Sequence, residues 1–215
     1  MQEAVQIAGL VLAAGESTRM GTDKAMLPWP SPPKGATGPS THTLLSAALA
    51  AFDRFTHLNA VVAGKNADAI ANAVGACGAY LVRNPAPENG QFSSLQIGLR
   101  EILDRGCNAA MITPVDCPPL SHSSLEHLYR AFLGALGADF WAIAPEHEGK
   151  HGHPLLANRD LIEVFLKAPI TSNAREVLHV HASRIVYVPV PEPLAKAGFN
   201  TPEEYAAAES RFQET

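Results

Sequence analysis

The feature that most restricts the fold of this chain is a regular alternation of strand-like and helix-like apolar patterns. Short apolar runs rich in β-branched or aromatic residues predict six strands, at residues 5–13, 58–63, 79–82, 109–113, 140–144 and 185–190. Apolar residues at intervals of three and four predict six helices, at residues 43–55, 67–74, 93–103, 121–136, 159–166 and 174–180. This order is typical of an α/β fold in which helices cover both faces of a mainly parallel sheet. Ligands of such sheets bind beyond the carboxyl ends of the strands, so functional motifs are expected directly after strands.

Length and composition indicate one ordinary globular domain spanning residues 1–215, since 47% of the residues are hydrophobic. A net charge of −5 and the lack of a basic run argue against nucleic acid or an anionic membrane as partner. Three widely spaced cysteines, Cys77, Cys107 and Cys117, favour reduced thiols. With no signal-type segment and no apolar run near ~18 residues, a cytoplasmic location is expected.

The segment from Pro28 to Pro39 holds five prolines and two glycines within twelve residues. Proline removes a backbone donor and fixes φ, so this composition excludes a regular helix or strand. We expect an exposed loop there.

The stretch LVLAAGESTRMGTDKAML at residues 10–27 leads from the first predicted strand into a small-residue turn. Ala13, Ala14 and Gly15 have almost no side chain, so the backbone can approach a ligand and offer its amide groups. Arg19 supplies a planar cationic fork and Lys24 a compact mobile charge, which together suit a polyphosphate. The alternative is a tight turn with two solvated cations, because a short glycine-bearing loop is weak evidence by itself.

This stretch resembles LAAGxSxRMGxxKxLL, the signature loop of nucleotidyltransferases that join a nucleoside monophosphate to a phosphorylated acceptor. Within that group the chain is most similar to the molybdenum cofactor nucleotidyltransferases. The resemblance continues, in the family's order, through GQFSSLQIGL at 90–99, PVDCPPL at 114–120, GHPLLANR at 152–159, NAREVL at 173–178 and NTPEEY at 200–205. It implies a three-layer α/β/α, Rossmann-like fold of the nucleotide-diphospho-sugar transferase type.

The resemblance also implies roles for individual residues. The nucleotide-binding positions would be Leu12, Ala13, Ala14, Gly15, Arg19, Lys24, Ser93 and Ser94. Asn84, in the LVRNP turn at the end of another predicted strand, is a further candidate for the same pocket. Arg19, Lys24 and Asp116 would be catalytic, because attack on the α-phosphorus places negative charge on the nucleophile, the equatorial oxygens and the leaving group together. Ser93 and Ser94 open a predicted helix, where capping is the simpler role.

A magnesium ion should assist this reaction, held by Asp116 and Asn200. Asp116 follows a predicted strand, and magnesium needs only one or two protein ligands beside substrate phosphates. The family's second ligand is often Asp, and Asn200 offers a neutral amide oxygen instead. The alternatives are a turn role for Asp116 and a helix-capping role for Asn200, which precedes Pro202 and Glu203.

Two histidine pairs, His151 with His153 and His179 with His181, have the spacing of residues that share a strand face. We expect no zinc, because such sites usually have three or four protein ligands and no third ligand is indicated. The HGHP run resembles the family's loop that faces the acceptor, so His153 is implied to bind an acceptor phosphate or to shape that loop. His179 and His181 are expected to be solvated.

The choice of nucleotide depends on few residues. Ala14 belongs to a cytidylyltransferase-like LAAG rather than a guanylyltransferase-like LAGG, and GHPLL and NAREVL also resemble the cytidylyl branch, whereas RMGTDKA resembles the guanylyl branch. The resemblance therefore favours transfer of CMP from CTP to a phosphorylated acceptor such as molybdopterin, with release of pyrophosphate. Transfer of GMP, or of a nucleotide to a sugar phosphate or polyol phosphate, stays open. So does a nucleotide-binding homologue without turnover, and a molybdoenzyme is a further candidate partner.

Overall fold

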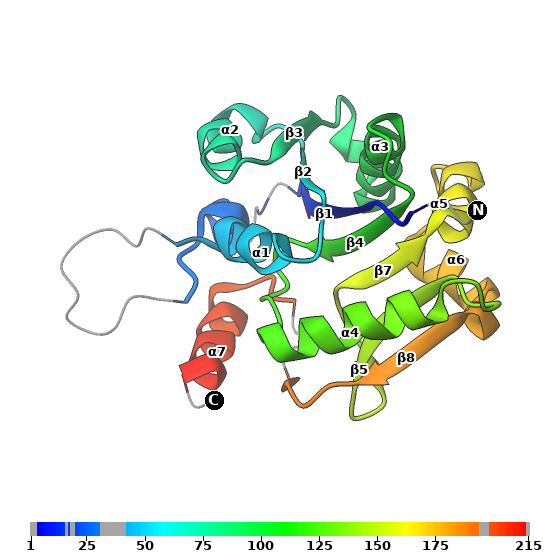
Figure 1. Cartoon of the computed structure of the whole chain (residues 1–215). Coiled ribbons are helices and arrows are strands. Elements are labelled where there is room, and N and C mark those ends of the chain that lie inside the picture. Colours follow the sequence, from blue (N-terminus) through cyan, green and yellow to red (C-terminus); the bar gives the residue numbers. More distant parts are fainter. Residues whose placement is uncertain (1–3, 16, 18–19, 31–41, 194–197, 214–215) are drawn as a thin grey trace.

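An eight-stranded mixed sheet forms the centre of the protein, which is described by a computed structural model (Figure 1). The structure describes residues 4–15, 17, 20–30, 42–193 and 198–213. The strands are β1 (Ile7–Ala13), β2 (Leu58–Ala63), β3 (Tyr80–Arg83), β4 (Ala109–Pro114), β5 (Ala142–His147), β6 (Lys150–His151), β7 (Leu155–Asn158) and β8 (Ile185–Pro189). Their order is β3-β2-β1-β4-β7-β5-β6, with β8 paired to β5.

Seven α-helices connect or follow these strands. They are α1 (Leu44–Phe52), α2 (Ala67–Ala76), α3 (Gln91–Asp104), α4 (His122–Ala135), α5 (Arg159–Lys167), α6 (Ala174–Val180) and α7 (Pro202–Gln213), among the described residues. The named 3-10 helices of the described residues are η2 (Lys24–Met26), η3 (Pro87–Asn89) and η4 (Ala182–Arg184). All six predicted strands and all six predicted helices are therefore present, with shifts of a few residues at their ends.

Strands β6 and β7 were not predicted from the sequence, and α7 entered only as the helix that Asn200 could cap. Strand β7 has only four residues and runs directly into α5, so its apolar residues cannot be separated from a helix start by periodicity. It pairs antiparallel with both β4 and β5, whereas β1, β2, β3 and β4 are parallel to one another. The expected mainly parallel sheet is thus confirmed, with an antiparallel insertion at β7.

Side chains of β1 alternate between the two faces of the sheet. Ile7 and Val11 pack in the hydrophobic cluster that contains α1, α2 and α4, and Leu10 packs in the cluster that contains α3 and α5. Helix α3 lies very close to the sheet, because a Cβ added at Gly98 would be 2.6 Å from Leu10 Cδ1 and 2.7 Å from Val62 Cγ2. Helices on both faces give the three-layer α/β/α architecture expected from the sequence.

The carboxyl ends of β1 and β4 lie side by side, because the two strands are parallel neighbours with Leu12 opposite Pro114. The loop after β1 and the turn after β4 therefore leave the sheet at the same edge. This geometry brings the signature loop near the PVDCP turn.

An aromatic cluster attaches α7 to the segment after η2. The ring centroid of Trp29 lies 6.4 Å from that of Phe199, 6.2 Å from that of Tyr205 and 5.3 Å from that of Phe212. Trp29 is only 1% exposed, which corrects the expectation that the whole proline-rich segment is an exposed loop. Residues 31–41 of that loop lie outside the described residues.

None of the helices in the described part of the chain is both long and apolar enough to cross a membrane. Cys77, Cys107 and Cys117 are free thiols, as the sequence analysis expected.

Candidate active site

Three side chains from distant parts of the chain meet beyond the sheet edge. The Lys24 Nζ atom donates to Asp116 Oδ2 at 2.8 Å and to Asn200 Oδ1 at 2.9 Å. The side chains of Lys24 and Asp116 are 12% and 23% exposed, so water screens this ion pair only in part. The structure thus brings together the predicted phosphate-binding lysine and both predicted metal ligands.

The geometry of the signature loop depends on two residues that the sequence analysis missed. Asp23 caps η2, where its Oδ1 accepts a hydrogen bond from the backbone nitrogen of Ala25. Asn66 Nδ2 donates to the Ala13 carbonyl at 2.9 Å and to Asp23 Oδ2 at 2.7 Å. Asn66 follows the carboxyl end of β2, where residues of a ligand site are expected, so its position in the sequence could have marked it as a site residue.

A cavity of about 420 Å³ lies against the signature loop and is called the smaller cavity here. It is lined by Leu12, Ala13, Ala14, Gly15, Ser17, Asp23, Lys24, Pro87, Glu88, Gly90, Gln91, Ser94, Pro114, Val115, Asp116 and Asn200. Most of the predicted nucleotide-binding residues therefore line the same cavity as the two predicted metal ligands. Arg19 lies outside the described residues.

Asn84, Ser93 and Ser94 form a buried hydrogen-bonded group. Asn84 Nδ2 donates to Ser93 Oγ at 3.0 Å and to Ser94 Oγ at 2.9 Å, and each of the three residues is at most 4% exposed. Ser94 lines the smaller cavity, whereas Ser93 donates its hydroxyl to the Gly90 carbonyl. Gly90 has a φ of +91°, a conformation that glycine adopts without strain.

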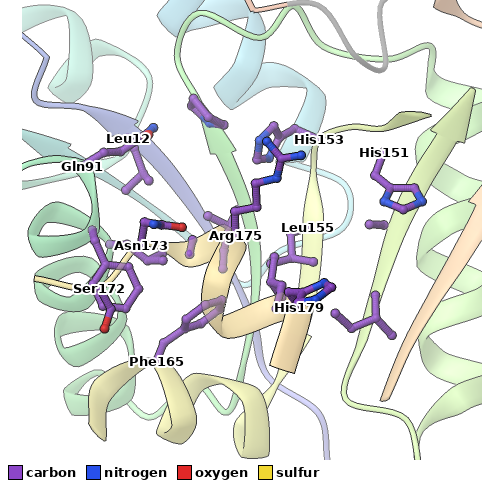
Figure 2. A pocket seen from close by; sticks show the side chains of 18 of the residues that line it. Leu12, Gln91, His151, His153, Leu155, Phe165, Ser172, Asn173, Arg175 and His179 are labelled. Carbon is purple, nitrogen blue, oxygen red and sulfur yellow. The ribbon is translucent and has the colours of Figure 1, made fainter. Parts of the chain in front are cut away.

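A second cavity of about 1110 Å³, called the larger cavity here, shares Leu12, Gly90, Gln91 and Pro114 with the smaller one. Figure 2 shows its labelled wall residues, which come from β1, α3, β6, β7, α5, α6 and the loops beside them. His153, the predicted acceptor-binding residue, is part of this wall. The two cavities therefore adjoin at the edge of the sheet, which provides space for two substrates side by side.

His153 is partly buried in this wall, and its Nδ1 atom is buried without a hydrogen-bond partner among the described residues. Burial lowers the pKa of His153 below its ordinary value, while a backbone group of Ile112 and the negative charge of Asp116 act in the opposite direction. A buried ring nitrogen without a partner costs stability.

The histidine pairs do not form a zinc site among the described residues, where no group of three His, Cys, Asp or Glu side chains is placed to hold a metal. The His151 ring stacks on Tyr187 with centroids 3.4 Å apart and planes within 8°. His179 is the penultimate residue of α6, and His181 caps that helix near Trp141. His179 is exposed and His181 is half-buried, so the expectation of solvated side chains holds in full only for His179.

The oxygen atoms of Asp116 and Asn200 fit a hard divalent cation. Both already converge on one positive charge, the Lys24 ammonium, and carboxylate and amide oxygens are suitable ligands for magnesium or manganese. Asn200 directly precedes α7, whose cap is Thr201: Glu204 N donates to Thr201 Oγ1, and Asn200 N donates to Glu204 Oε2. Because these backbone contacts form the helix start, the Asn200 side chain is directed to Lys24 instead.

Comparison with known proteins adds independent information. The family model of the MobA-like NTP transferase domain matches residues 9–185. A molybdenum cofactor cytidylyltransferase of Escherichia coli (strain K12) is 24% identical over 205 residues, which are 95% of this chain and 96% of that protein. A probable molybdenum cofactor guanylyltransferase of Mycobacterium avium (strain 104) is 31% identical over 128 residues, which are 60% of this chain and 58% of that protein.

Among solved structures, Rv0371c of Mycobacterium tuberculosis H37Rv in complex with manganese has the same fold. Its TM-score is 0.70 at 20% sequence identity, and the superposition covers 96% of this chain and 99% of that chain. Asp116 lies within the residues that the family model matches, whereas Asn200 and α7 lie beyond them.

Proposed function

The chain belongs to the family of MobA-like NTP transferase domains, and from this premise we propose that it transfers CMP from CTP to a phosphorylated acceptor such as molybdopterin. Membership makes it a nucleotidyltransferase, whereas the nucleotide, the acceptor and the metal are parts of the proposal. The observation that carries the proposal is the meeting of Lys24, Asp116 and Asn200 at the smaller cavity, beside a larger cavity that can hold the acceptor. A cytoplasmic location is part of the same proposal.

In the proposed reaction, an oxygen of the acceptor phosphate forms a bond to the α-phosphorus of the nucleotide. The bond from that phosphorus to the β-phosphate oxygen breaks, and pyrophosphate leaves with the electron pair. A phosphate nucleophile is already ionised at neutral pH, so no side chain has to remove a proton. The residues of the site instead have to orient two anionic groups and offset their charge.

Lys24 is the described side chain that fits this task best, since its ammonium lies at the wall of the smaller cavity. Arg19 would add a second cation from the same loop, as the family resemblance implies. Asp116 and Asn200 would hold a divalent cation, which neutralises phosphate charge when it is bound. The manganese complex of Rv0371c supports this metal role by analogy.

The preference for CTP depends on the Ala14 position. Ala14 lines the smaller cavity, where its methyl group reduces the room for a purine base relative to glycine. One methyl group in a pocket typically discriminates by only about 1–3 kcal/mol, so GTP is the principal alternative. Because the chain is similar to both a cytidylyltransferase and a guanylyltransferase, the test includes both CTP and GTP.

A panel of nucleoside triphosphates with magnesium and molybdopterin tests the proposal. We expect the wild-type chain to release pyrophosphate with CTP and to release less with GTP. The Asp116→Asn variant should release none with either nucleotide. A thermal shift with each nucleotide measures binding separately from turnover. Release with GTP alone, or with a sugar phosphate and not with molybdopterin, would replace the proposed substrates and leave the nucleotidyltransferase assignment in place.

A nucleotide-binding homologue without turnover is the second candidate, which the neutral Asn200 favours. It predicts thermal stabilisation by CTP or GTP without pyrophosphate release for any acceptor. If Asn200→Asp gains release that the wild-type chain lacks, the neutral ligand explains the missing turnover. A molybdoenzyme as binding partner would then be the next interaction to measure.

A further inference from the structure

An aromatic cluster of four rings, Trp29, Phe199, Tyr205 and Phe212, joins α7 to the chain between η2 and α1. Tyr205 and Phe212 are seven positions apart, which places both rings on one face of α7. Phe199 lies just before the helix, and its ring centroid is 5.1 Å from that of Tyr205. Trp29 is therefore the ring on which three residues of the C-terminal segment converge.

Trp29 is a fixed base for this cluster, because its own segment is bound to the start of α1. Its backbone nitrogen donates to the His42 carbonyl at 3.1 Å, and the Leu44 nitrogen donates to the Leu27 carbonyl at 2.8 Å. The Trp29 side chain is 1% exposed, and its Nε1 atom has no hydrogen-bond partner among the described residues. The position of this side chain therefore depends on ring packing rather than on a hydrogen bond of the indole.

The same two segments also meet at the active site. Lys24 lies five positions before Trp29, and Asn200 directly follows Phe199. The Lys24 Nζ atom donates to Asn200 Oδ1 at 2.9 Å. In the described part of the chain, the four rings line neither the smaller nor the larger cavity, so they do not act by touching a ligand there. The aromatic contact instead fixes the two segments whose other side chains meet at the site.

Hydrogen bonds at the start of α7 connect the helix to Asn200. The Asn200 nitrogen donates to Glu204 Oε2 at 2.6 Å, and the Glu204 nitrogen donates to Thr201 Oγ1 at 3.3 Å. The hydroxyl of Tyr205, the next residue of the helix, donates to the Pro28 carbonyl. A displacement of α7 would therefore move the Asn200 backbone, and with it the amide oxygen at the active site.

We propose that the aromatic cluster positions the Asn200 amide oxygen at the active site, so that rings outside the site set its affinity for a divalent cation. This inference rests on the proposed function, in which Asn200 is a metal ligand. Because an amide oxygen carries no net charge to attract the cation, its contribution to affinity depends on being held in place beforehand. Trp29, Tyr205 and Phe212 are positioning residues in this scheme.

The first test compares Phe212→Ala with the matched control Phe140→Ala. The two rings are 38% and 40% exposed, and Phe140 lies outside both cavities. In a Mn²⁺ titration without nucleotide, Phe212→Ala should raise the Kd about three- to tenfold, because the apparent affinity falls with the fraction of molecules in which α7 is packed in place. Tyr205→Phe, which removes the hydroxyl bound to Pro28, should act in the same direction with a smaller effect. Phe140→Ala should leave the Kd unchanged.

A double-mutant cycle separates the positioning of Asn200 from a general loosening of the fold. In the Asn200→Ala background, Phe212→Ala should change the Kd for Mn²⁺ by less than about twofold, because the ligand that the rings position is already absent. The same rise in Kd in both backgrounds, or an unchanged Kd for Phe212→Ala alone, would overturn the inference.

A conservative variant tests the base of the cluster. Trp29→Phe should bind Mn²⁺ nearly as tightly as the wild-type chain does, since it keeps a ring and loses no hydrogen bond of the described residues. Trp29→Leu should approach the Kd of Asn200→Ala. A wild-type Kd for Trp29→Leu would refute the role of the ring.

Hydrogen exchange measures the packing of α7 without any metal. The amides of residues 202–213 should exchange faster in Phe212→Ala than in the wild-type chain, while those of β1 and β4 exchange at the wild-type rate. Unchanged exchange in α7 would show that the rings do not hold the helix. Faster exchange in β1 and β4 as well would indicate a general loosening, and either result would count against the inference.

The proposed function and this inference fail in different ways. If no nucleoside triphosphate supports pyrophosphate release while the cycle gives the expected result, the proposed function fails and the positioning role stands. If the wild-type chain releases pyrophosphate and Asn200→Ala weakens Mn²⁺ binding, but Phe212→Ala does not, the proposed function stands and the positioning role is refuted. If Asn200→Ala binds Mn²⁺ as tightly as the wild-type chain does, the amide is not a metal ligand, and the dependence of metal affinity on the rings is refuted with it.

Discussion

Lys24 has a consequence for metal binding that can be measured without any turnover. Its ammonium contacts the same two oxygen atoms, Asp116 Oδ2 and Asn200 Oδ1, that we assign to the divalent cation. A metal ion that binds in the absence of nucleotide must displace this ammonium. We therefore predict that Lys24→Met binds Mn²⁺ more tightly than the wild-type chain does when no nucleotide is present.

The size of the effect follows from the exposure of the contacts. A hydrogen bond to a charged group contributes about 1.5–3 kcal/mol, whereas a fully exposed ion pair contributes about 0.2–1 kcal/mol. With side chains 12% and 23% exposed, Lys24 and Asp116 lie between these cases, and we take about 1–2 kcal/mol as the cost of displacement. Because about 1.4 kcal/mol corresponds to a tenfold change, the Kd for Mn²⁺ should fall about 5- to 30-fold.

The assay is a Mn²⁺ titration followed by electron paramagnetic resonance of the free ion at constant ionic strength. Lys167→Met is the matched control, since Lys167 is an exposed lysine of α5 paired with Glu163. It should leave the Kd unchanged, and Asp116→Asn should weaken binding. An unchanged or higher Kd in Lys24→Met, with Asp116→Asn still weakening binding, would refute the idea that the ammonium competes with the metal.

Three further predictions address packing, protonation and the buried polar group. Gly98→Ala should lower the free energy of unfolding by about 1–3 kcal/mol, because the added Cβ would meet side chains of the sheet. Gly75→Ala in α2, where the added Cβ meets open space, should raise the free energy of unfolding by up to about 1 kcal/mol. Equal melting temperatures of the two variants would contradict this prediction. Since burial lowers the pKa of His153 from its ordinary 6.5, the unfolded chain binds this proton more readily, and stability should fall as pH drops below 6.5. Urea unfolding at several pH values should show a smaller fall for His153→Gln, and parallel curves would count against the lowered pKa. Asn84→Ala should lower the free energy of unfolding by about 1–3 kcal/mol, because Ser93 Oγ, Ser94 Oγ and Ala86 N each lose their hydrogen bond to Asn84. Ser94→Ala should mainly raise the KM for nucleotide.

Much of the fold follows from the sequence because the strands and helices have clear periodic patterns. Strand β1 is buried on both faces and reads as a continuous apolar run, as strands of parallel sheets do. Strand β7 could not be predicted, because an antiparallel insertion of four residues has no pattern of its own and depends on pairing with β4 and β5. The burial of Trp29 depends likewise on α7, which is remote in the sequence.

The candidate site was predictable where a residue type and its position after a strand are both informative. Lys24 and Asp116 satisfy both conditions, and the structure brings them within 2.8 Å of each other. Asn66 also follows a strand, but its hydrogen bonds to the Ala13 carbonyl and to Asp23 exist only in three dimensions. The nucleotide-binding roles of Asn84 and Ser93 remain predictions, with a structural role now visible for both.

The separation of Lys24 and Asn200 along the chain affects when the site can form during synthesis. The two residues are 176 positions apart. At about 5–20 residues per second, a ribosome needs roughly 9–35 s to pass from one to the other. Throughout that interval β1, η2 and, later, Asp116 are already made, but the amide oxygen and the aromatic anchor of α7 are not. A truncated chain that ends before Asn200 could therefore form most of the sheet and still fail to bind metal. Metal binding would then distinguish chains that include α7 from chains that end before it.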